Sequence, residues 1–412
     1  MIRRAYSHSC PHCGGIKNTV KLPSCQRGDV KALALIGVIA LADDDTSPLS
    51  VGEGPEDQPL SKAYLNVIKT LFKDGAPDGI DEATTLENVK TFMSGVFEGY
   101  GQNFDTVKWN SPDHEKLLHL EKNVYQFSGA KNWQMLRDLT SAIKQDGKIL
   151  PYREYRTKAL AIIGEYQGNW LNTEYNAAIA GAQMASKWVD YSAHPEALLE
   201  YRTMEDTHVR PEHAELNGII RPVNDKFWDT YYPPNGWNCR CTVIRLNDGK
   251  ETKEKDVPYP EIPKMFATNL AKTGLLFPKG SAYYIGTPAN IENANLNIQR
   301  NDLTKWAQKN LQGNKYPSAI GDITVNGTGI NKFFNQPHKN VFEKNIAVYN
   351  LPDILNTAKL FDKSEDTTGK FKQLYYMTTK IAGKKNYIVV RETFQGEKNF
   401  YTIQDNNKKE KG

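Results

Sequence analysis

Two cysteines and two histidines between residues 208 and 241 are the side chains best suited to hold a metal ion. Cys239 and Cys241 flank Arg240 in a segment that we expect to be extended, so both thiols would point to the same side. His213, or His208 five residues before it, would supply imidazole nitrogens. A mixed Cys/His set of this kind is typical of Zn²⁺ sites. Structural zinc is therefore one hypothesis for this block.

The same block can also be stabilised without a metal. Trp228, Tyr232 and Trp237 would form a small apolar core, and Asp206 would form an ion pair with Arg210. A catalytic cysteine is a third hypothesis, because a neighbouring cation lowers the pKa of a thiol, but no third group that would orient a Cys–His pair is evident. The sequence favours apolar burial and leaves zinc open.

A second group of cysteines lies near the N-terminus. Cys10 and Cys13 form a C-x-x-C pair, Cys25 follows, and His8 and His12 lie beside them. Strong zinc signatures contain two such pairs, so structural zinc and no metal are equally open here. Five cysteines in 412 residues do not form a disulfide framework.

The last hundred residues contain side chains that could cleave RNA without a metal. Such cleavage uses the 2′-hydroxyl of the substrate as nucleophile, and it needs a proton-transfer group and cations that stabilise the developing charge. His338 is the single histidine in this part, and Lys339 follows it. Arg391 and Thr393 would share one strand face, with Tyr401 on the paired strand. We expect these five residues to form a catalytic site; the alternative is a non-catalytic binding or decoration domain.

The charge is unevenly distributed along the chain. Its net charge of +4 is too small for the whole protein to be a nucleic-acid-binding protein. Residues 313–412 contain 16 Lys and Arg against 10 Asp and Glu, a net charge of +6, so the remainder carries −2. A basic C-terminal part favours a polyanionic partner such as RNA, although a solvated lysine-rich surface explains the same excess.

Neither a membrane segment nor a common nucleotide-binding or metalloprotease motif is expected. The longest apolar run, residues 32–42, is about half as long as a membrane-spanning helix needs to be. It also begins too late for an ordinary signal peptide, so we expect a cytoplasmic protein without a membrane partner. Walker, Rossmann and H-E-x-x-H motifs do not occur.

Apolar periodicity predicts a long helical hairpin or bundle ahead of the cysteine-containing block. A stripe at i, i+3, i+4 and i+7 starts at Tyr64, Ser111-Pro112 begins a second helix, and residues 152–189 give the strongest helical signal. Turn formers fill 201–248, a helix is expected over 351–360, and two strands are expected at 387–390 and 399–403.

The predicted fold class is therefore α+β. It consists of a helical bundle with a small Cys/His/Trp-containing α+β block, followed by a separate, small basic α+β domain. The expected parts are an N-terminal segment at 1–59, a main domain at 60–250, a connection at 251–315 and a C-terminal domain at 316–405.

Residues 202–243 resemble the signature block of phage Mu F-type head-morphogenesis, or minor capsid, proteins. The resemblance covers roughly residues 60–245 and includes the stretch 169–178. It implies action near the portal of the capsid during head assembly, with portal and capsid proteins as partners. It also implies a location in the bacterial host cytoplasm during assembly and in the virion afterwards.

Some relatives have cysteines at the positions of Arg210 and His213, which fits a metal site with a changing ligand set. The matching residues are Asp206, Arg210, His213, Gly218, Phe227-Trp228, Pro233-Pro234 and Cys239-Arg240-Cys241.

Residues 316–405 resemble, more weakly, phage-borne nuclease domains of the barnase–EndoU–colicin–RelE group, which often follow Mu F-type domains as toxin-like tips. The resemblance implies a metal-independent ribonuclease at the C-terminus. The residues that carry it are Gly321-Asp322-Ile323, Gly329-Ile330, Gln336-Pro337-His338, Leu351–Leu360, Arg391 and Tyr401.

Overall fold

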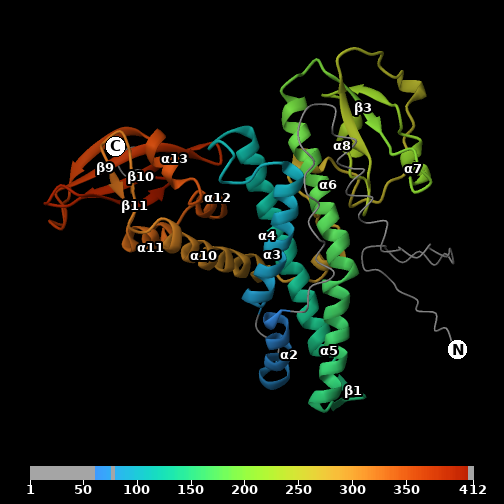
Figure 1. Ribbon diagram of the computed structural model, residues 1–412, viewed down its shortest axis with the longest axis horizontal. Helices are drawn as coiled ribbons and strands as arrows, with labels where there is room; N and C mark the ends of the chain where they lie inside the picture. The colour runs from blue at the N-terminus through green and yellow to red at the C-terminus, as the bar shows by residue number, and fades with distance from the viewer. Residues whose placement is uncertain (1–60, 76–78, 407–412) are drawn as a thin grey trace. The chain divides into compact units, whose positions relative to one another are not determined.

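The computed structural model describes residues 61–75 and 79–406 and has an α+β fold, which confirms the predicted class (Figure 1). The chain forms two compact units. We call residues up to Gly99 together with Ala130–Pro288 the first unit, and Tyr100–Gly129 together with Ala289–Gly412 the second unit. Residues 32–42 lie outside the described residues.

Long helices dominate the first half of the chain, where amphipathic stripes predicted them. Helix α2 buries the predicted stripe of Tyr64, Val67, Ile68 and Leu71. Ser111 begins α4 as expected, since its hydroxyl accepts a hydrogen bond from the His114 amide at 3.1 Å. The helices are α2 (Lys62–Asp74), α3 (Glu82–Tyr100), α4 (Pro112–Ser141), α5 (Tyr152–Gln167) and α6 (Asn169–Ser192).

The strongest helical signal, over residues 152–189, corresponds to two consecutive helices. Helix α5 ends at Gln167 and α6 begins at Asn169, with Gly168 between them. Helix α5 buries Tyr155, Ala159, Ile163 and Tyr166. Helix α3 approaches α6 closely at Gly99, because a Cβ on Gly99 would lie 2.2 Å from the Ile179 carbonyl oxygen.

A buried ion pair lies inside the helices of the first unit. The ammonium group of Lys131 on α4 pairs with the carboxylate of Glu174 on α6, and both side chains are at most 1% exposed. The Tyr283 hydroxyl donates to the second Glu174 oxygen at 2.9 Å. Since buried charges are costly without partners, this network fixes how α4 and α6 pack.

A small antiparallel sheet follows α6 in the first unit and has the strand order β4-β3-β5. Trp228 on α8 is fully buried beside it, and its indole N–H donates to the Pro222 carbonyl at 2.9 Å. The elements are β3 (Leu198–Arg202), α7 (Pro211–Ala214), β4 (Ile220–Pro222), α8 (Phe227–Tyr231) and β5 (Thr242–Leu246). The hairpin β1 (Lys144–Gln145) and β2 (Lys148–Ile149) precedes α5, and η2 (Glu254–Asp256), α9 (Leu270–Thr273) and η3 (Ala282–Tyr284) follow β5.

The segment expected as a connection, residues 251–315, contains regular structure, including the 21-residue helix α10 (Asn290–Asn310). Helix α10 belongs to the second unit together with the start of α4. Its buried residues include Ile291, Ile298 and Leu303. Most residues of this segment are polar. The apolar residues of α10 are too widely spaced for the sequence to reveal this helix.

A six-stranded sheet forms most of the second unit, with the order β6-β7-β11-β10-β9-β8. Strands β10 and β11 form the predicted hairpin, but β8 and β9 are additional, and the helix expected over 351–360 ends at Thr357. The elements are β6 (Lys315–Tyr316), β7 (Ile323–Thr324), α11 (Gly327–Asn335), α12 (Val341–Ile346), α13 (Leu351–Thr357), β8 (Lys359–Glu365), β9 (Gln373–Ile381), β10 (Lys384–Glu392) and β11 (Lys398–Gln404).

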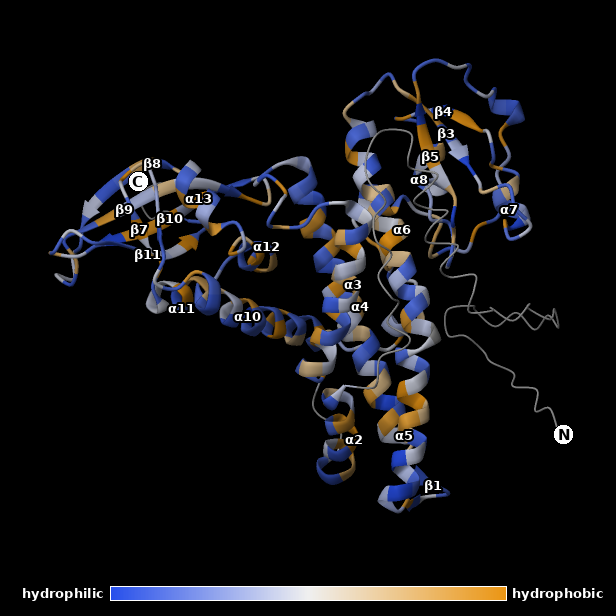
Figure 2. Cartoon of the chain, in the orientation of Figure 1, coloured by the Kyte–Doolittle hydropathy of each residue, from blue (hydrophilic) through white to orange (hydrophobic). Residues whose placement is uncertain are grey.

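Apolar residues are interspersed with polar ones along the helices, as expected for elements with one buried side (Figure 2). Within residues 61–75 and 79–406, no helix is both long and apolar enough to span a membrane.

Glu121 on α4 is a buried carboxyl group in the second unit. It is 4% exposed, and its Oε2 has no hydrogen-bond partner. Burial, with a smaller contribution from Asp302, raises the pKa of Glu121 to about 8. Between about pH 4.5 and pH 8 the folded protein therefore holds a proton that the unfolded chain has released, and stability falls as the pH rises through this window.

We predict that Glu121→Gln removes much of this pH dependence. The difference in free energy of unfolding between the variant and the wild type should be larger at pH 8.5 than at pH 5. We expect it to shift in favour of the variant by roughly 2–5 kcal/mol. Urea unfolding at both pH values measures the difference. Glu115→Gln, an exposed glutamate on the same helix, is the matched control and should behave like the wild type. An unchanged pH slope in Glu121→Gln would contradict the assignment.

Candidate metal centre

Three of the predicted metal ligands converge in the first unit. His213 lies on α7, while Cys239 and Cys241 lie in the segment that leads into β5. The imidazole Nδ1 is 3.7 Å from Sγ of Cys239 and 3.6 Å from Sγ of Cys241, and the three atoms lie within 4.8 Å of one another. Both thiols thus point to the same side, as the spacing around Arg240 predicted.

The two thiols influence each other's protonation. Hydrogen bonding with Cys241 lowers the pKa of Cys239 well below its ordinary value, and His213 contributes in the same direction. The same hydrogen bond, together with burial, raises the pKa of Cys241. One thiolate is therefore favoured within the pair, and a thiolate is the form of cysteine that binds a metal.

The surroundings hold the segment in place. Arg240 points away from the sulfurs and forms two hydrogen bonds of 2.6 Å with Asp206. The Asp206–Arg210 ion pair considered from the sequence is wrong, because the Arg210 guanidinium instead donates to the Trp237 carbonyl at 2.7 Å. In the pairing of β3 with β5, Arg202 lies opposite Thr242, the residue that follows Cys241.

Tyr201 is a neighbour of the site that the sequence did not single out. It is fully buried, its hydroxyl hydrogen-bonds Asn235 at 3.1 Å, and it interacts with Cys241. Its position depends on strand pairing between β3 and β5, in which Tyr201 lies opposite Val243. No local sequence signal gives such a pairing.

His208 does not join the three ligands. Its side chain is 70% exposed, and its Nδ1 lies 3.9 Å from Asp206. It does line the small cavity beside the cluster, together with Met204, Val209 and Asn238. His213, Cys239 and Cys241 line the same cavity.

The donor set fits zinc in type and spacing. Two sulfurs and one imidazole nitrogen are ligands that Zn²⁺ prefers, and three protein ligands leave one position of a tetrahedron open. The His213 Nε2 atom is buried and has no partner among the described residues. Metal-bound histidines usually donate from their other nitrogen, so this part of the expected surroundings is missing. Cys10, Cys13 and Cys25, with His8 and His12, lie outside the described residues.

The five residues expected to form a catalytic site in the second unit do not all come together. His338 Nε2 bonds the Asn386 side chain at 2.7 Å, near the start of β10. Arg391 is five residues further along β10, about 16 Å at the usual rise per residue. Because strand residues alternate in direction and β10 pairs regularly with β9, positions 386 and 391 face opposite sides of the sheet.

Arg391 and Tyr401 do meet. The guanidinium carbon lies 3.2 Å from the centre of the Tyr401 ring and 4.8 Å from that of Phe371. Thr393 lies beyond the end of β10, where its amide bonds the Glu397 carbonyl in the turn. Lys339 is exposed, and its amide bonds Asp405. The arrangement joins a cation to aromatic rings but leaves the histidine apart.

Comparison with known proteins identifies two matched regions. Residues 134–244 match the family described as Phage Mu protein F like protein, and residues 294–401 match the large polyvalent protein-associated domain 3. The second match is to a family other than the nuclease group expected from the sequence. No solved structure matches the chain.

Two curated relatives are similar over short stretches. Over 48 residues the chain is 50% identical to the putative capsid assembly protein F of Escherichia phage Mu, which is 12% of this chain and 11% of that protein. Over 76 residues it is 37% identical to the Mu-like prophage FluMu F protein of Haemophilus influenzae, which is 18% of this chain and 17% of the relative. The chain thus matches less than a fifth of the length of either relative. These comparisons support a relation of residues 134–244 to the Phage Mu F-like family, and that stretch contains His213, Cys239 and Cys241.

Proposed function

We propose that this protein acts in the assembly of a phage capsid. The observation that carries the proposal is the match of residues 134–244 to the Phage Mu F-like family, one relative of which is named a putative capsid assembly protein. The matched stretch includes α5, α6 and most of the three-stranded sheet, all of which contribute buried residues. The proposed partners are portal and capsid proteins, and the proposed locations are the host cytoplasm during assembly and then the virion.

Deletion of the codons for residues 134–244 from a phage genome that encodes this chain should abolish DNA-filled heads. A point variant that unfolds the sheet should act in the same direction. Trp228→Ala removes a fully buried ring, which typically costs about 3–5 kcal/mol. Lys226→Ala, an exposed neighbour, is the control. Electron microscopy of lysates measures the fraction of filled heads, and normal heads in the deletion would refute the proposal.

We further propose that His213, Cys239 and Cys241 hold a structural zinc ion. The convergence of the three side chains supports this hypothesis. A bound Zn²⁺ would act as a crosslink between the α7 segment and the segment before β5. His208 could serve as a fourth ligand only if its exposed side chain left Asp206 and turned into the neighbouring cavity. The alternative is stabilisation by apolar burial alone.

Zinc analysis should be done with Cys10, Cys13 and Cys25 all changed to Ser, so that metal on the N-terminal cysteines does not contribute. In that background, we expect about one zinc per chain. Changing Cys239 and Cys241 to Ser should remove it and lower the melting temperature, because metal binding contributes to folding. His208→Ala should retain the zinc. Protein without zinc from a zinc-supplemented culture, with unchanged melting of the double variant, would sink the hypothesis.

A second function is favoured by the side chains on one face of the C-terminal sheet. The opposite face is the core, where Met377, Ile388, Val390 and Ile403 are fully buried. Strand register places a second set together on the other face, since directly paired residues share a side. This face includes the buried residues Tyr387 and Val389. Seven further side chains on it are exposed or half-buried: Lys359, Asp362, Tyr376, Thr378, Lys380, Lys385 and Arg391.

Cations lie over aromatic rings on this open face. The Lys385 ammonium is 4.4 Å from the ring centre of Phe361, which is 44% exposed, and Arg391 lies over Tyr401. Four of the seven side chains just named are cations and one is an acid. Cations beside exposed aromatic rings are the features with which proteins hold single-stranded nucleic acid. We therefore propose that the open face binds RNA.

Cleavage of RNA by this domain remains a prediction. His338, the predicted proton-transfer group, lies on the opposite side of β10 from Arg391. This geometry favours RNA binding through Arg391 and Tyr401 over a catalytic site that His338 and Arg391 share. The alternative, a non-catalytic decoration module, predicts no RNA binding through this face.

Binding and cleavage can be measured together on the full chain with a fluorescent single-stranded RNA in EDTA. Tyr401→Ala and Lys385→Ala should weaken binding about 5- to 50-fold, because a stacked base contributes roughly 1–3 kcal/mol and a cation contributes a salt-dependent attraction. Lys363→Ala, on the other face of β8, is the matched control. RNA fragments that disappear in His338→Ala would confirm the ribonuclease prediction, while no binding by the wild type would eliminate both functions.

A further inference from the structure

Five exposed cations surround the hairpin β1–β2 and the first turns of α5 in the first unit. Residues 144–158 contain these five cations and two acids, so their net charge is +3. Figure 1 shows the hairpin at the end of α5 that is remote from the small sheet. We propose that this region, which we call the basic tip, binds duplex DNA by inserting the hairpin into the major groove. The cations of the basic tip are Lys144, Lys148, Arg153, Arg156 and Lys158.

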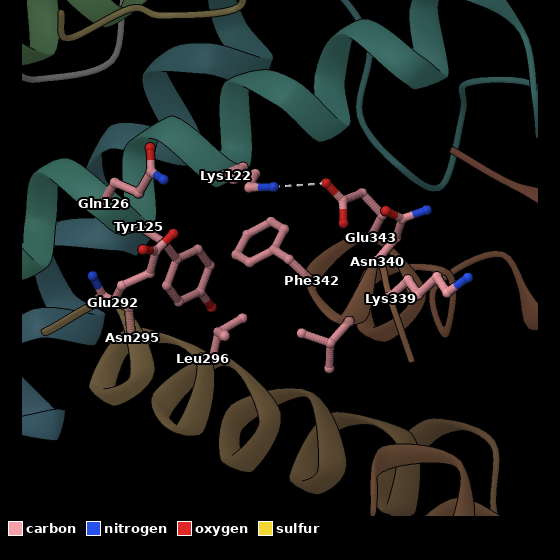
Figure 3. A pocket seen from close by; sticks show the side chains of 11 residues that line it. Lys122, Tyr125, Gln126, Glu292, Asn295, Leu296, Lys339, Asn340, Phe342 and Glu343 are labelled. Carbon is pink, nitrogen blue, oxygen red and sulfur yellow. Dashed lines mark hydrogen bonds and ion pairs between the residues drawn. The ribbon is translucent and has the colours of Figure 1, made fainter. Parts of the chain in front are cut away.

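The charge of the basic tip is not neutralised within the protein. Lys158 donates to the Gln145 side chain at 2.6 Å, and the other four cations form no ion pair in the part of the chain that the structure describes. By contrast, the partly exposed Lys122 on α4 pairs with Glu343 at 2.9 Å, as the dashed line in Figure 3 shows. Like charges that lie close together without counter-charges repel one another, and a polyanionic partner relieves this repulsion.

The hairpin has a defined shape before any partner binds. Asp146 and Gly147 have φ values of 50° and 76°. Two consecutive positive φ values are what a two-residue type I′ turn requires, and Asp-Gly is a preferred sequence for it. At the base of the hairpin, the Leu150 amide donates to the Ile143 carbonyl at 2.9 Å. A preformed hairpin loses little conformational freedom on binding, which favours affinity.

Cations lie on both sides of the hairpin. Lys144 and Gln145 are consecutive strand residues, so their side chains point to opposite faces. Lys148 pairs with Gln145 and shares its face, and Lys158 contacts Gln145 from α5. A flat anionic surface would be met by cations on one face only. Phosphates on both rims of a groove match cations on both faces, and the major groove of B-DNA, about 12 Å wide, admits a two-stranded ribbon.

The remaining side chains of the basic tip also suit a DNA groove. Arg153 and Arg156 are three residues apart on α5 and are therefore neighbours on its surface. Their guanidinium groups can each bind a phosphate through two hydrogen bonds. Ile149 is 67% exposed, and apolar side chains in the major groove contact thymine methyl groups. An acidic peptide would present its carboxylates along one chain, so it would not match cations on both faces of the hairpin.

The test is fluorescence anisotropy of the full chain with a blunt DNA duplex of about 20 base pairs at several salt concentrations. We expect the logarithm of the association constant to fall with the logarithm of the salt concentration with a slope of about −3 to −4.5, since up to five phosphates are neutralised. Removal of the four unpaired cations should weaken binding at least about 30-fold at ~0.1 M salt and reduce the slope by about 3. This variant carries Lys144→Gln, Lys148→Gln, Arg153→Gln and Arg156→Gln.

A charge-matched control removes four exposed lysines elsewhere in the first unit. Because charges beyond about 10 Å are screened at ~0.1 M salt, the affinity of this control should stay within about twofold of the wild type. Tyr401→Ala, on the open sheet face, should also leave duplex binding unchanged, which separates the basic tip from the proposed RNA-binding face. The control carries Lys226→Gln, Lys250→Gln, Lys264→Gln and Lys279→Gln.

Duplex RNA of the same sequence tests insertion into the groove. The major groove of A-form RNA is deep and narrow, so the hairpin should not enter it, and we expect duplex RNA to bind at least about fivefold more weakly than DNA. This comparison uses the Tyr401→Ala chain, in which RNA binding through the open face contributes little. Poly-L-glutamate of the same total charge represents an acidic protein partner and should bind more weakly than the DNA.

Four results would overturn the proposal. They are no binding of duplex DNA by the wild type, equal losses in the tip variant and its charge-matched control, equal affinity for duplex DNA and duplex RNA, and tighter binding of poly-L-glutamate than of DNA. Far-ultraviolet circular dichroism verifies that each variant is folded; all eight substituted side chains are exposed, so we expect no loss of structure.

Discussion

The buried pair of Lys131 and Glu174 is the interaction on which the first unit depends most. Both side chains are almost fully shielded from water, so each charge needs the other in place. Phe92 and Tyr283 surround the ammonium group, with ring centres 5.5 and 5.9 Å away. One specific contact thereby fixes the register of α6 against α4, which apolar packing alone would leave free to slide.

The position of α6 in turn fixes the small sheet that bears the metal ligands. Lys187 on α6 donates to the Thr242 hydroxyl at 2.9 Å, and the Tyr191 hydroxyl donates to the Val243 carbonyl at 3.1 Å. Thr242 directly follows Cys241, so these bonds place β5 and the thiols that precede it. Tyr232 reaches back to the Met184 carbonyl at 3.0 Å. A continuous set of buried contacts thus runs from the helical core to the Cys/His cluster, which explains how a short, turn-rich block can hold three ligand atoms close together.

The second unit is organised by the alternation of side chains along β10. Even-numbered positions such as Ile388 and Val390 form the core, while Lys385 and Arg391 project from the other face. Because Asn386 and Arg391 face opposite sides of β10, His338, which hydrogen-bonds Asn386, is separated from Arg391. Arg391 instead lies over the ring of Tyr401. The sequence predicted one site that includes His338 and Arg391, and in the fold these two residues lie on different sides of one sheet.

Local patterns in the sequence determined the amphipathic stripe of α2, the start of α4 at Ser111-Pro112, the β10–β11 hairpin and the common direction of Cys239 and Cys241. Each of these depends on residues a few positions apart, whose geometry is set by the backbone period. Only the tertiary structure decided that His213 and not His208 meets the thiols, that Asp206 pairs with Arg240, that β8 and β9 complete the sheet, and that α10 lies within a stretch expected as a connection. These outcomes depend on pairing and burial between segments far apart in the chain, for which local spacing carries no information.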